Sequence, residues 1–187
     1  MAESPRDRLL GAATKLFYRD GFHAVGIDRI LREAGVAKMT LYSHFASKDA
    51  LIAETLRRRA RQFETDFERE VMATASPRRR LLAVFEALDA WIGSAEFQGC
   101  MFVAAAAEFH EADHPARVAA AEHKRAMRAF LLRLAKDAEA KDAETLAARL
   151  ALLVEGTIAL AHVAGDREAA TRAQATAELI LHDAFAA

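Results

Sequence analysis

The sequence predicts an all-α protein in which a small N-terminal helical domain, residues 1–50, precedes a larger helical domain, residues 51–187. Three observations support this prediction. Apolar residues recur three and four positions apart along nearly the whole chain, which is the spacing of one helix face. No stretch of strand length alternates convincingly between apolar and polar residues. Only three prolines and eight glycines interrupt 187 residues that are 53% hydrophobic, and much of that share is alanine, a strong helix former.

The N-terminal domain is predicted to contain three helices. Ser4 followed by Pro5 is typical of a helix start, because the serine hydroxyl can cap the first turn and proline fits its first position. The helix over 5–20 ends at an Asp-Gly pair. A second helix of about two turns covers 27–34 and is ended by a glycine, and a third covers 38–45.

The larger domain keeps the helical spacing to its end. Pro77 and Pro115 indicate the first turns of two helices, and Gly165 indicates a break between two others. The predicted helices cover 47–73, 76–94, 97–111, 115–139, 142–165 and 167–185.

Charge is distributed unevenly along the chain. The whole sequence carries a net charge of −1, but residues 1–60 contain 11 Lys and Arg against 7 Asp and Glu, which leaves residues 61–187 at −5. The basic N-terminal third is therefore the expected contact for a polyanion. Neither a signal peptide nor a membrane span is expected, and the single cysteine, Cys100, suits a reducing compartment. We expect a cytoplasmic protein without a membrane partner or a cofactor.

Two short helices joined at Gly35 predict a helix-turn-helix, in which the second helix can enter a DNA major groove. The stretch GIDRILREAGVAKMTLYSHFASKDALI resembles the DNA-binding domain of the TetR family of bacterial transcriptional regulators, and the resemblance covers about residues 5–58. It implies a non-enzymatic regulator whose partner is a double-stranded DNA operator. The matching residues are Ala34, Gly35, Val36, Thr40, Leu41, Tyr42, His44, Phe45, Ser47, Lys48 and Leu51.

The third helix is expected to turn Leu41 and Phe45 inward and its polar side outward. Hydroxyl, imidazole and ammonium groups on that side suit phosphate contacts, whereas Lys38, Met39 and Ser43 are expected to contact base edges. The resemblance assigns the phosphate-contacting positions to the same helix. The expected DNA-binding residues are Arg29, Lys38, Met39, Thr40, Tyr42, Ser43, His44 and Lys48.

Two positions depart from the family pattern. Gly26 stands where many relatives have threonine or serine, which puts one hydroxyl-to-phosphate contact in doubt, although a backbone N–H can replace it. Met39 stands where glycine is common, so an apolar contact to a thymine methyl group is possible there.

The last two predicted helices have apolar faces wider than one intramolecular contact needs. We expect them to pair with their copies in a homodimer, as the family resemblance also implies, and such symmetry predicts a palindromic operator. The alternative is that both helices only complete the core of one chain. The expected interface residues are Leu150, Leu153, Val154, Thr157, Ile158, Ala177, Ile180 and Leu181.

The middle of the chain is rich in aromatic residues and is expected to wall a cavity for a small organic effector, because the resemblance implies a repressor released from DNA by its ligand. Two alternatives remain: these side chains are plain core, and the protein regulates transcription without an effector. The candidate ligand-binding residues are Phe85, Trp91, Phe97, Cys100, Met101, Phe102, Glu108, Phe109, His110 and Glu155.

The segment HEADH, residues 110–114, has the spacing of a zinc-hydrolase motif. Such a site needs His110 and His114 one turn apart on a continuous helix, with a third ligand from elsewhere. Pro115 disfavours helical angles at His114, so we expect His114 to lie at a helix boundary and Pro115 to start the next helix. A zinc-dependent hydrolase is therefore the least favoured alternative, and no metal site is expected.

Overall fold

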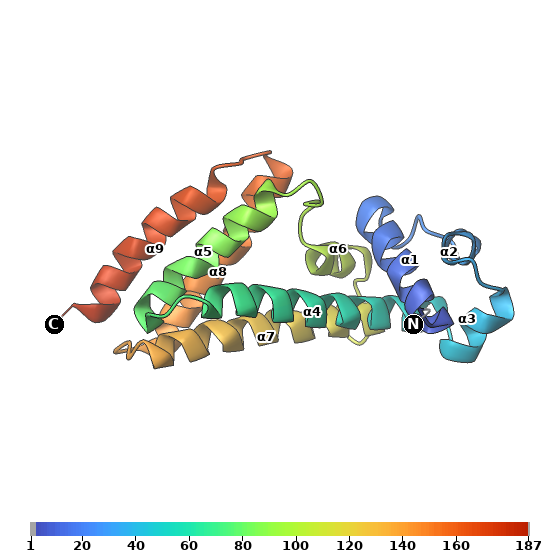
Figure 1. Ribbon diagram of the computed structural model, residues 1–187, viewed down its shortest axis with the longest axis horizontal. Helices are drawn as coiled ribbons and strands as arrows, with labels where there is room; N and C mark the ends of the chain where they lie inside the picture. The colour runs from blue at the N-terminus through green and yellow to red at the C-terminus, as the bar shows by residue number, and fades with distance from the viewer. Residues whose placement is uncertain (1–2, 187) are drawn as a thin grey trace. The chain divides into compact units, whose positions relative to one another are not determined.

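A computed structural model describes residues 3–186, and within them every regular element is an α-helix. Figure 1 labels these helices in chain order. Their bounds are α1 Pro5–Asp20, α2 Ile27–Ala34, α3 Lys38–His44, α4 Lys48–Met72, α5 Pro77–Gly93, α6 Met101–Glu108, α7 Pro115–Asp137, α8 Ala143–Val163 and α9 Ala169–Phe185.

The helices form two compact units. The first unit contains the chain up to Phe63 together with Met101–His123, and the second contains Glu64–Cys100 and the chain from Lys124 onward. Helices α4 and α7 each contribute to both units. The predicted functional boundary at residues 50 and 51 therefore lies within a continuous helix, near its start, and stays a prediction.

The first unit is built around the packing of α1 on α2 and α3. Ser4 accepts a hydrogen bond from the backbone N–H of Asp7 and Pro5 occupies the first turn, as the sequence predicts. Gly35 ends α2 at φ 62°, a left-handed conformation that favours glycine. Elsewhere in this unit His123 is buried, with its ring stacked at 3.8 Å on Phe102.

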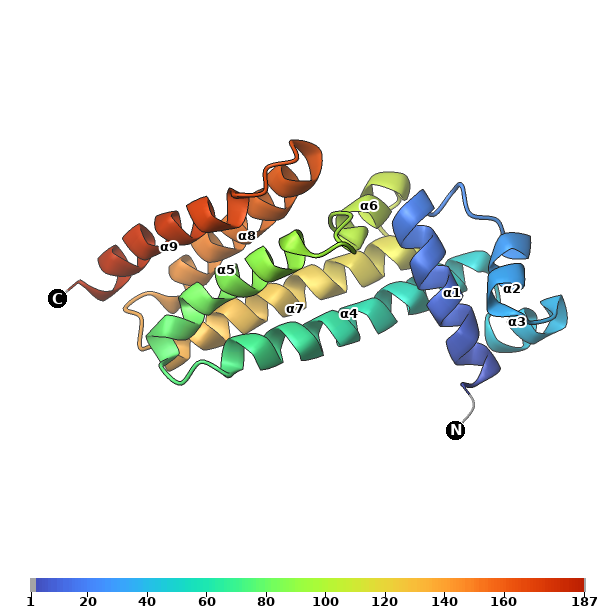
Figure 2. The same cartoon turned by 45° about the horizontal axis from the view of Figure 1, so that its top comes forward.

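The second unit is a layer of helices in which α9 packs against both α5 and α8, and Figure 2 shows these three helices side by side. Its core contains fully buried aliphatic and aromatic side chains, among them Phe85, Phe130 and Leu150. Arg167 donates a hydrogen bond to the carbonyl of Ile92 at 2.6 Å, which ties the turn before α9 to the end of α5. The helix bounds follow from ordinary start signals, including Ser76 at α5 and Asp142 at α8.

One predicted helix is shorter than the sequence pattern indicates. The sequence pattern predicts a helix over 97–111, whereas α6 covers only Met101–Glu108. Gly99 has φ 82°, which a helix does not allow, and a Cβ atom there would lie 2.5 Å from the ring of His162. Contact with a helix remote in sequence therefore sets the backbone before α6.

Helix α8 is apolar around most of its circumference. By length and composition alone it is the one helix in the described residues that could cross a membrane, and 39% of its most apolar stretch is buried. Part of the helix packs against α9 and α5. The remaining apolar side chains point away from this packing, so α8 has one face for its own unit and a second, uncovered face.

Candidate nucleic-acid interface

Helix α3 is held by two apolar side chains and leaves its other side exposed. Leu41 is completely buried and Phe45, directly after the helix, is 5% exposed, which confirms the predicted inward pair. The guanidinium of Arg6 lies 5.5 Å from the Phe45 ring centre and covers it from α1. The amphipathic pattern of α3 thus fixes which side chains point outward.

The outward side of α3 consists of exposed polar residues and one methionine. Lys38, Ser43 and His44 are exposed, Tyr42 is 46% exposed and Met39 is 79% exposed. Within residues 3–186, the side chains of Lys38 and Tyr42 have no hydrogen bond or ion pair, so both are available to a ligand. Figure 1 shows α3 at one end of its unit.

The other two predicted hydroxyl groups on α3 are less open. Thr40 is half-buried, and the Ser43 hydroxyl donates to the backbone carbonyl of Thr40 at 2.8 Å. Ser43 therefore presents its oxygen as an acceptor and not its proton. This geometry suits acceptance from a base amino group better than donation to a phosphate oxygen.

Two further predicted DNA-binding residues are held by intramolecular contacts. Arg29 forms an ion pair with Asp20 at 2.6 Å, and a hydrogen bond from Arg19, with the charge of Arg29, lowers the pKa of that carboxyl group. The ammonium group of Lys48 donates to the carbonyl of Phe22 at 2.8 Å, and burial lowers its pKa. Both residues support the α1–α2 loop, and their DNA contacts stay predictions.

Glu108, predicted to bind a ligand, instead holds the same α1–α2 loop. One carboxylate oxygen accepts the backbone N–H of Phe22 at 2.9 Å, and the other accepts that of His23 at 2.7 Å. The imidazole Nε2 of His23 lies 3.0 Å from the backbone carbonyl oxygen of Glu108. Charge-assisted bonds of this kind are strong. The carboxylate thus joins the end of α6 to the helices that carry α3.

The HEADH segment does not have the geometry of a helical zinc motif. Helix α6 ends at Glu108 and α7 begins at Pro115, so His110 and His114 do not share a helix. His114 accepts the backbone N–H of Ala116 at 3.2 Å and stacks on Phe109, which confirms its predicted place at a helix boundary.

The predicted effector residues lie in different surroundings, and their role in binding a ligand stays a prediction. Phe85, Met101, Phe102 and Phe109 are buried as core, and His110 is exposed. Trp91 packs edge-to-face on Phe97 at 5.0 Å, and the Cys100 sulfur lies 3.4 Å from the ammonium of Lys124. Of the ten predicted residues, only Glu155 lines the cavity between α7 and α8. Sequence spacing indicates which residues are apolar, but it does not indicate where the folded helices leave space.

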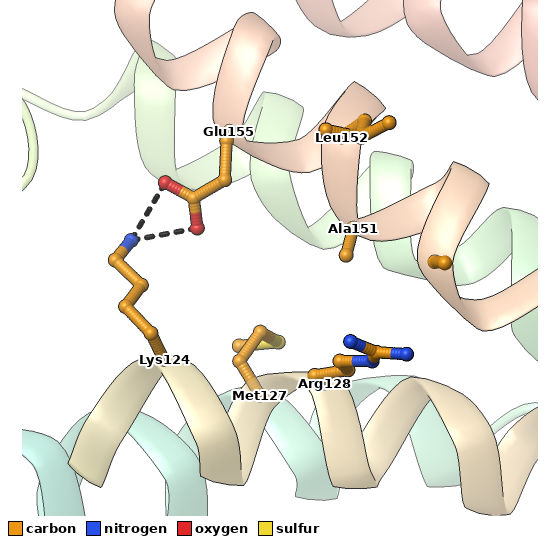
Figure 3. A pocket seen from close by; sticks show the side chains of 7 residues that line it. Lys124, Met127, Arg128, Ala151, Leu152 and Glu155 are labelled. Carbon is orange, nitrogen blue, oxygen red and sulfur yellow. Dashed lines mark hydrogen bonds and ion pairs between the residues drawn. The ribbon is translucent and has the colours of Figure 1, made fainter. Parts of the chain in front are cut away.

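A cavity of about 510 Å³ lies between α7 and α8 in the second unit. Figure 3 shows Lys124 and Glu155 joined across it, with both carboxylate oxygens 2.7 Å from the ammonium nitrogen. The four-residue spacing of Lys124 and Arg128 around Met127 is the sequence signal for this site, which the sequence prediction did not include. The lining residues are Lys124, Met127, Arg128, Ala148, Ala151, Leu152 and Glu155.

The predicted dimer residues are mostly unavailable to a partner. Six of the eight, which are Leu150, Val154, Thr157, Ile158, Ala177 and Leu181, are buried in the second unit, and Leu153 and Ile180 are half-buried. The exposed apolar side chains of α8 are Leu152 at 75%, Leu160 at 54% and Val163 at 84%, with Leu179 at 74% on α9. Both faces of α8 are apolar, so periodicity alone does not indicate which one points inward, and the interface residues stay a prediction.

Two family models match the chain. One, described as bacterial regulatory proteins of the tetR family, matches residues 9–55, and the other, described as a tetracyclin repressor-like C-terminal domain, matches residues 77–177. The transcriptional activator FasR of Mycolicibacterium smegmatis is 39% identical over 82 residues, which are 44% of this chain and only 37% of FasR. The regulator YjdC of Escherichia coli K12 is 25% identical over 155 residues, which cover 82% of this chain and 81% of YjdC.

Solved structures of similar proteins match over nearly their whole length. A TetR-family transcriptional regulator from Streptomyces coelicolor has a TM-score of 0.88 and 31% identity, covering 96% of this chain and 95% of that one. A putative regulator of the same family from Streptomyces avermitilis has a TM-score of 0.79 and 34% identity, covering 94% and 99%. With its helix-turn-helix and its all-α C-terminal domain, the chain belongs to the TetR family of DNA-binding transcriptional regulators.

Proposed function

We propose that this regulator is a homodimeric repressor that leaves its operator when a small organic ligand binds. The observation that supports it most is the outward side of α3, where the exposed side chains of Lys38 and Tyr42 have no partner in the described part of the chain and lie next to exposed Met39. Phosphate contacts from such side chains fix a helix in the major groove, and contacts to base edges select the sequence. As a DNA-binding regulator, the protein would act in the cytoplasm.

The uncovered face of α8 supports the dimer. Leu160 and Val163 lie three positions apart on α8, outside the lining of the cavity, and Leu179 adds to them from α9. We call these three side chains the apolar stripe. A second copy could cover the stripe across a two-fold axis, with α8 and α9 of each chain forming a four-helix contact. Two α3 helices related by that axis would have to lie about 34 Å apart to contact successive major grooves.

The ligand would act by favouring one of two arrangements of the dimer. With the cavity empty, the two α3 helices would match one operator, and a ligand that prefers another arrangement would shift the population away from it. The cavity between α7 and α8 supports a ligand site because its volume lies within the range of small-molecule pockets.

Selection of bound duplexes from a random pool tests the proposal most directly. A palindromic consensus with half-sites about one helical turn apart is expected, because a two-fold dimer presents two identical helices. A single unrepeated site would contradict the dimer, and the absence of any enriched sequence would contradict the function assigned to α3.

A further inference from the structure

We propose that the cavity between α7 and α8 binds an organic anion with an apolar body, and that Arg128 is the residue that pairs with its charge. The inference rests on the proposed function, because it names the class of ligand that such a regulator would respond to. The cavity lies within the second unit, and its charges and its lining carry the inference.

The charged groups of the cavity leave one positive charge uncompensated. Lys124 and Glu155 neutralise each other, since both carboxylate oxygens lie 2.7 Å from the ammonium nitrogen. Arg128 is exposed and, within residues 3–186, has no hydrogen bond or ion pair. Figure 3 shows the Lys124–Glu155 pair at one end of the space and Arg128 at the other. A ligand with a single negative charge would therefore complete the site.

The rest of the lining is apolar. Met127 and Ala151 face the space between the helices, and Ala148 and Leu152 complete its wall. Methionine adapts to irregular apolar shapes, and the alanines leave room for an inserted group. A guanidinium binds a carboxylate through two parallel hydrogen bonds, a geometry that an ammonium does not reproduce. The ligand class that fits is thus a carboxylate, or a similar planar or tetrahedral anion, attached to a hydrocarbon or aromatic body.

A neutral or cationic ligand would fit the site less well. A neutral ligand would leave the Arg128 guanidinium without a charged partner, and a cation would meet it directly while Glu155 is already engaged by Lys124. The charge of Arg128 therefore discriminates between ligands of similar shape, and the apolar wall contributes affinity without regard to charge.

Calorimetric titration of the whole protein with 4-phenylbutyrate and its uncharged amide tests this proposal. The two probes share the same apolar body and differ only in charge. We expect the carboxylate to bind about tenfold more tightly than the amide, as a charge-assisted hydrogen bond predicts at a partly exposed site. The Arg128→Gln variant should remove that difference and leave the melting temperature unchanged, since the Arg128 side chain has no partner among residues 3–186.

Arg125→Gln is the matched control, because Arg125 is exposed on the same helix and does not line the cavity. This variant should keep the tenfold preference for the carboxylate. The proposal would be overturned if the unmutated protein bound both probes equally or bound neither. It would also be overturned if both variants lost the preference for the carboxylate to the same extent. Probe binding that weakens as the protein dimerises would also overturn it, because a partner chain would then fill the cavity. None of these outcomes affects the band shift with the selected operator, which tests the proposed function separately.

Discussion

Helices α3 and α8 each have a face that the rest of their own unit leaves uncovered, but the two faces differ in chemistry. On α3 the exposed side chains are mostly polar, and Met39 is the one large apolar residue among them. On α8 the exposed side chains Leu152, Leu160 and Val163 are apolar. Exposure alone therefore indicates that a partner is expected, and the chemistry of the face indicates which kind.

The two faces also differ in the free energy that the protein forgoes when no partner covers them. Polar side chains on α3 are hydrated in the free protein and lose that water only when they contact DNA. Each large apolar side chain on α8 forgoes about 1.5–3 kcal/mol of burial free energy as long as it stays in water. We therefore expect α3 to be free between binding events, and the stripe on α8 to be covered permanently by a second chain.

The largest expected effect follows from placing charge in the apolar stripe. The double change Leu160→Asp with Val163→Asp should convert the proposed dimer to a monomer, because two carboxylates of each chain would be buried without partners. Affinity for a palindromic operator should then fall about a hundredfold or more, since the two half-sites are no longer bound by one linked molecule. Analytical ultracentrifugation and a gel shift measure the two effects. Val103→Asp, at a 51% exposed site on α6, is the control and should change neither.

The next largest effect is expected on α3. Tyr42→Ala should weaken binding about tenfold to the selected operator and to unrelated duplexes alike, because a contact to phosphate does not depend on sequence. Gel shifts with both kinds of duplex measure this. Tyr42→Phe removes only the hydroxyl group and shows how much of the loss the hydrogen bond explains. Unchanged affinity in Tyr42→Ala would mean that this side of α3 does not lie on DNA.

A smaller effect is expected at Lys38. Lys38→Ala should lower the slope of log affinity against log salt concentration by at most about 1, if the side chain also displaces a counterion from phosphate. It should also change the base preference at one position of each half-site, because the exposed ammonium can reach guanine acceptors. A repeated selection experiment and a salt titration measure both effects. Lys136→Ala, exposed at the end of α7, is the control and should preserve slope and preference.

The smallest effect is expected at Met39. Met39→Ala should reduce operator affinity about threefold, the effect of losing roughly one buried methylene contact, and only where the facing base is thymine. Replacing that thymine in the operator with uracil, which lacks the methyl group, should reduce the affinity of the unmutated protein by the same factor. An undiminished response to uracil in Met39→Ala would place the methyl contact elsewhere.

The helices were predictable from local signals, and the outward face of α3 was predictable from its pattern. Ser4 and Ser76 cap helices at the positions where the sequence indicates a start. Leu41 lies between polar neighbours, so its inward direction follows from periodicity. Prediction was reliable wherever neighbours in sequence decide the structure.

Contacts between distant segments were not predictable in the same way. The start of α6 depends on the ring of His162 against Gly99, which lies in another part of the sequence. The buried face of α8 could not be chosen because both of its faces are apolar. The cavity depends on the space that α7 and α8 leave between Met127 and Ala151. The spacing of apolar residues in the sequence does not predict that space.

The hydrogen bonds of Glu108 to the α1–α2 loop make two positions, 21 and 108, depend on each other. The carboxylate holds main-chain groups, so the side chain of exposed His23 could change while the two N–H bonds persist. Gly21 has no such freedom: its φ is 83°, and a Cβ atom there would approach a carboxylate oxygen of Glu108 to 3.0 Å. Any larger residue at position 21 would strain the backbone and crowd that oxygen. A redesign of this turn would therefore have to begin on α6, at a residue 87 positions further along the chain.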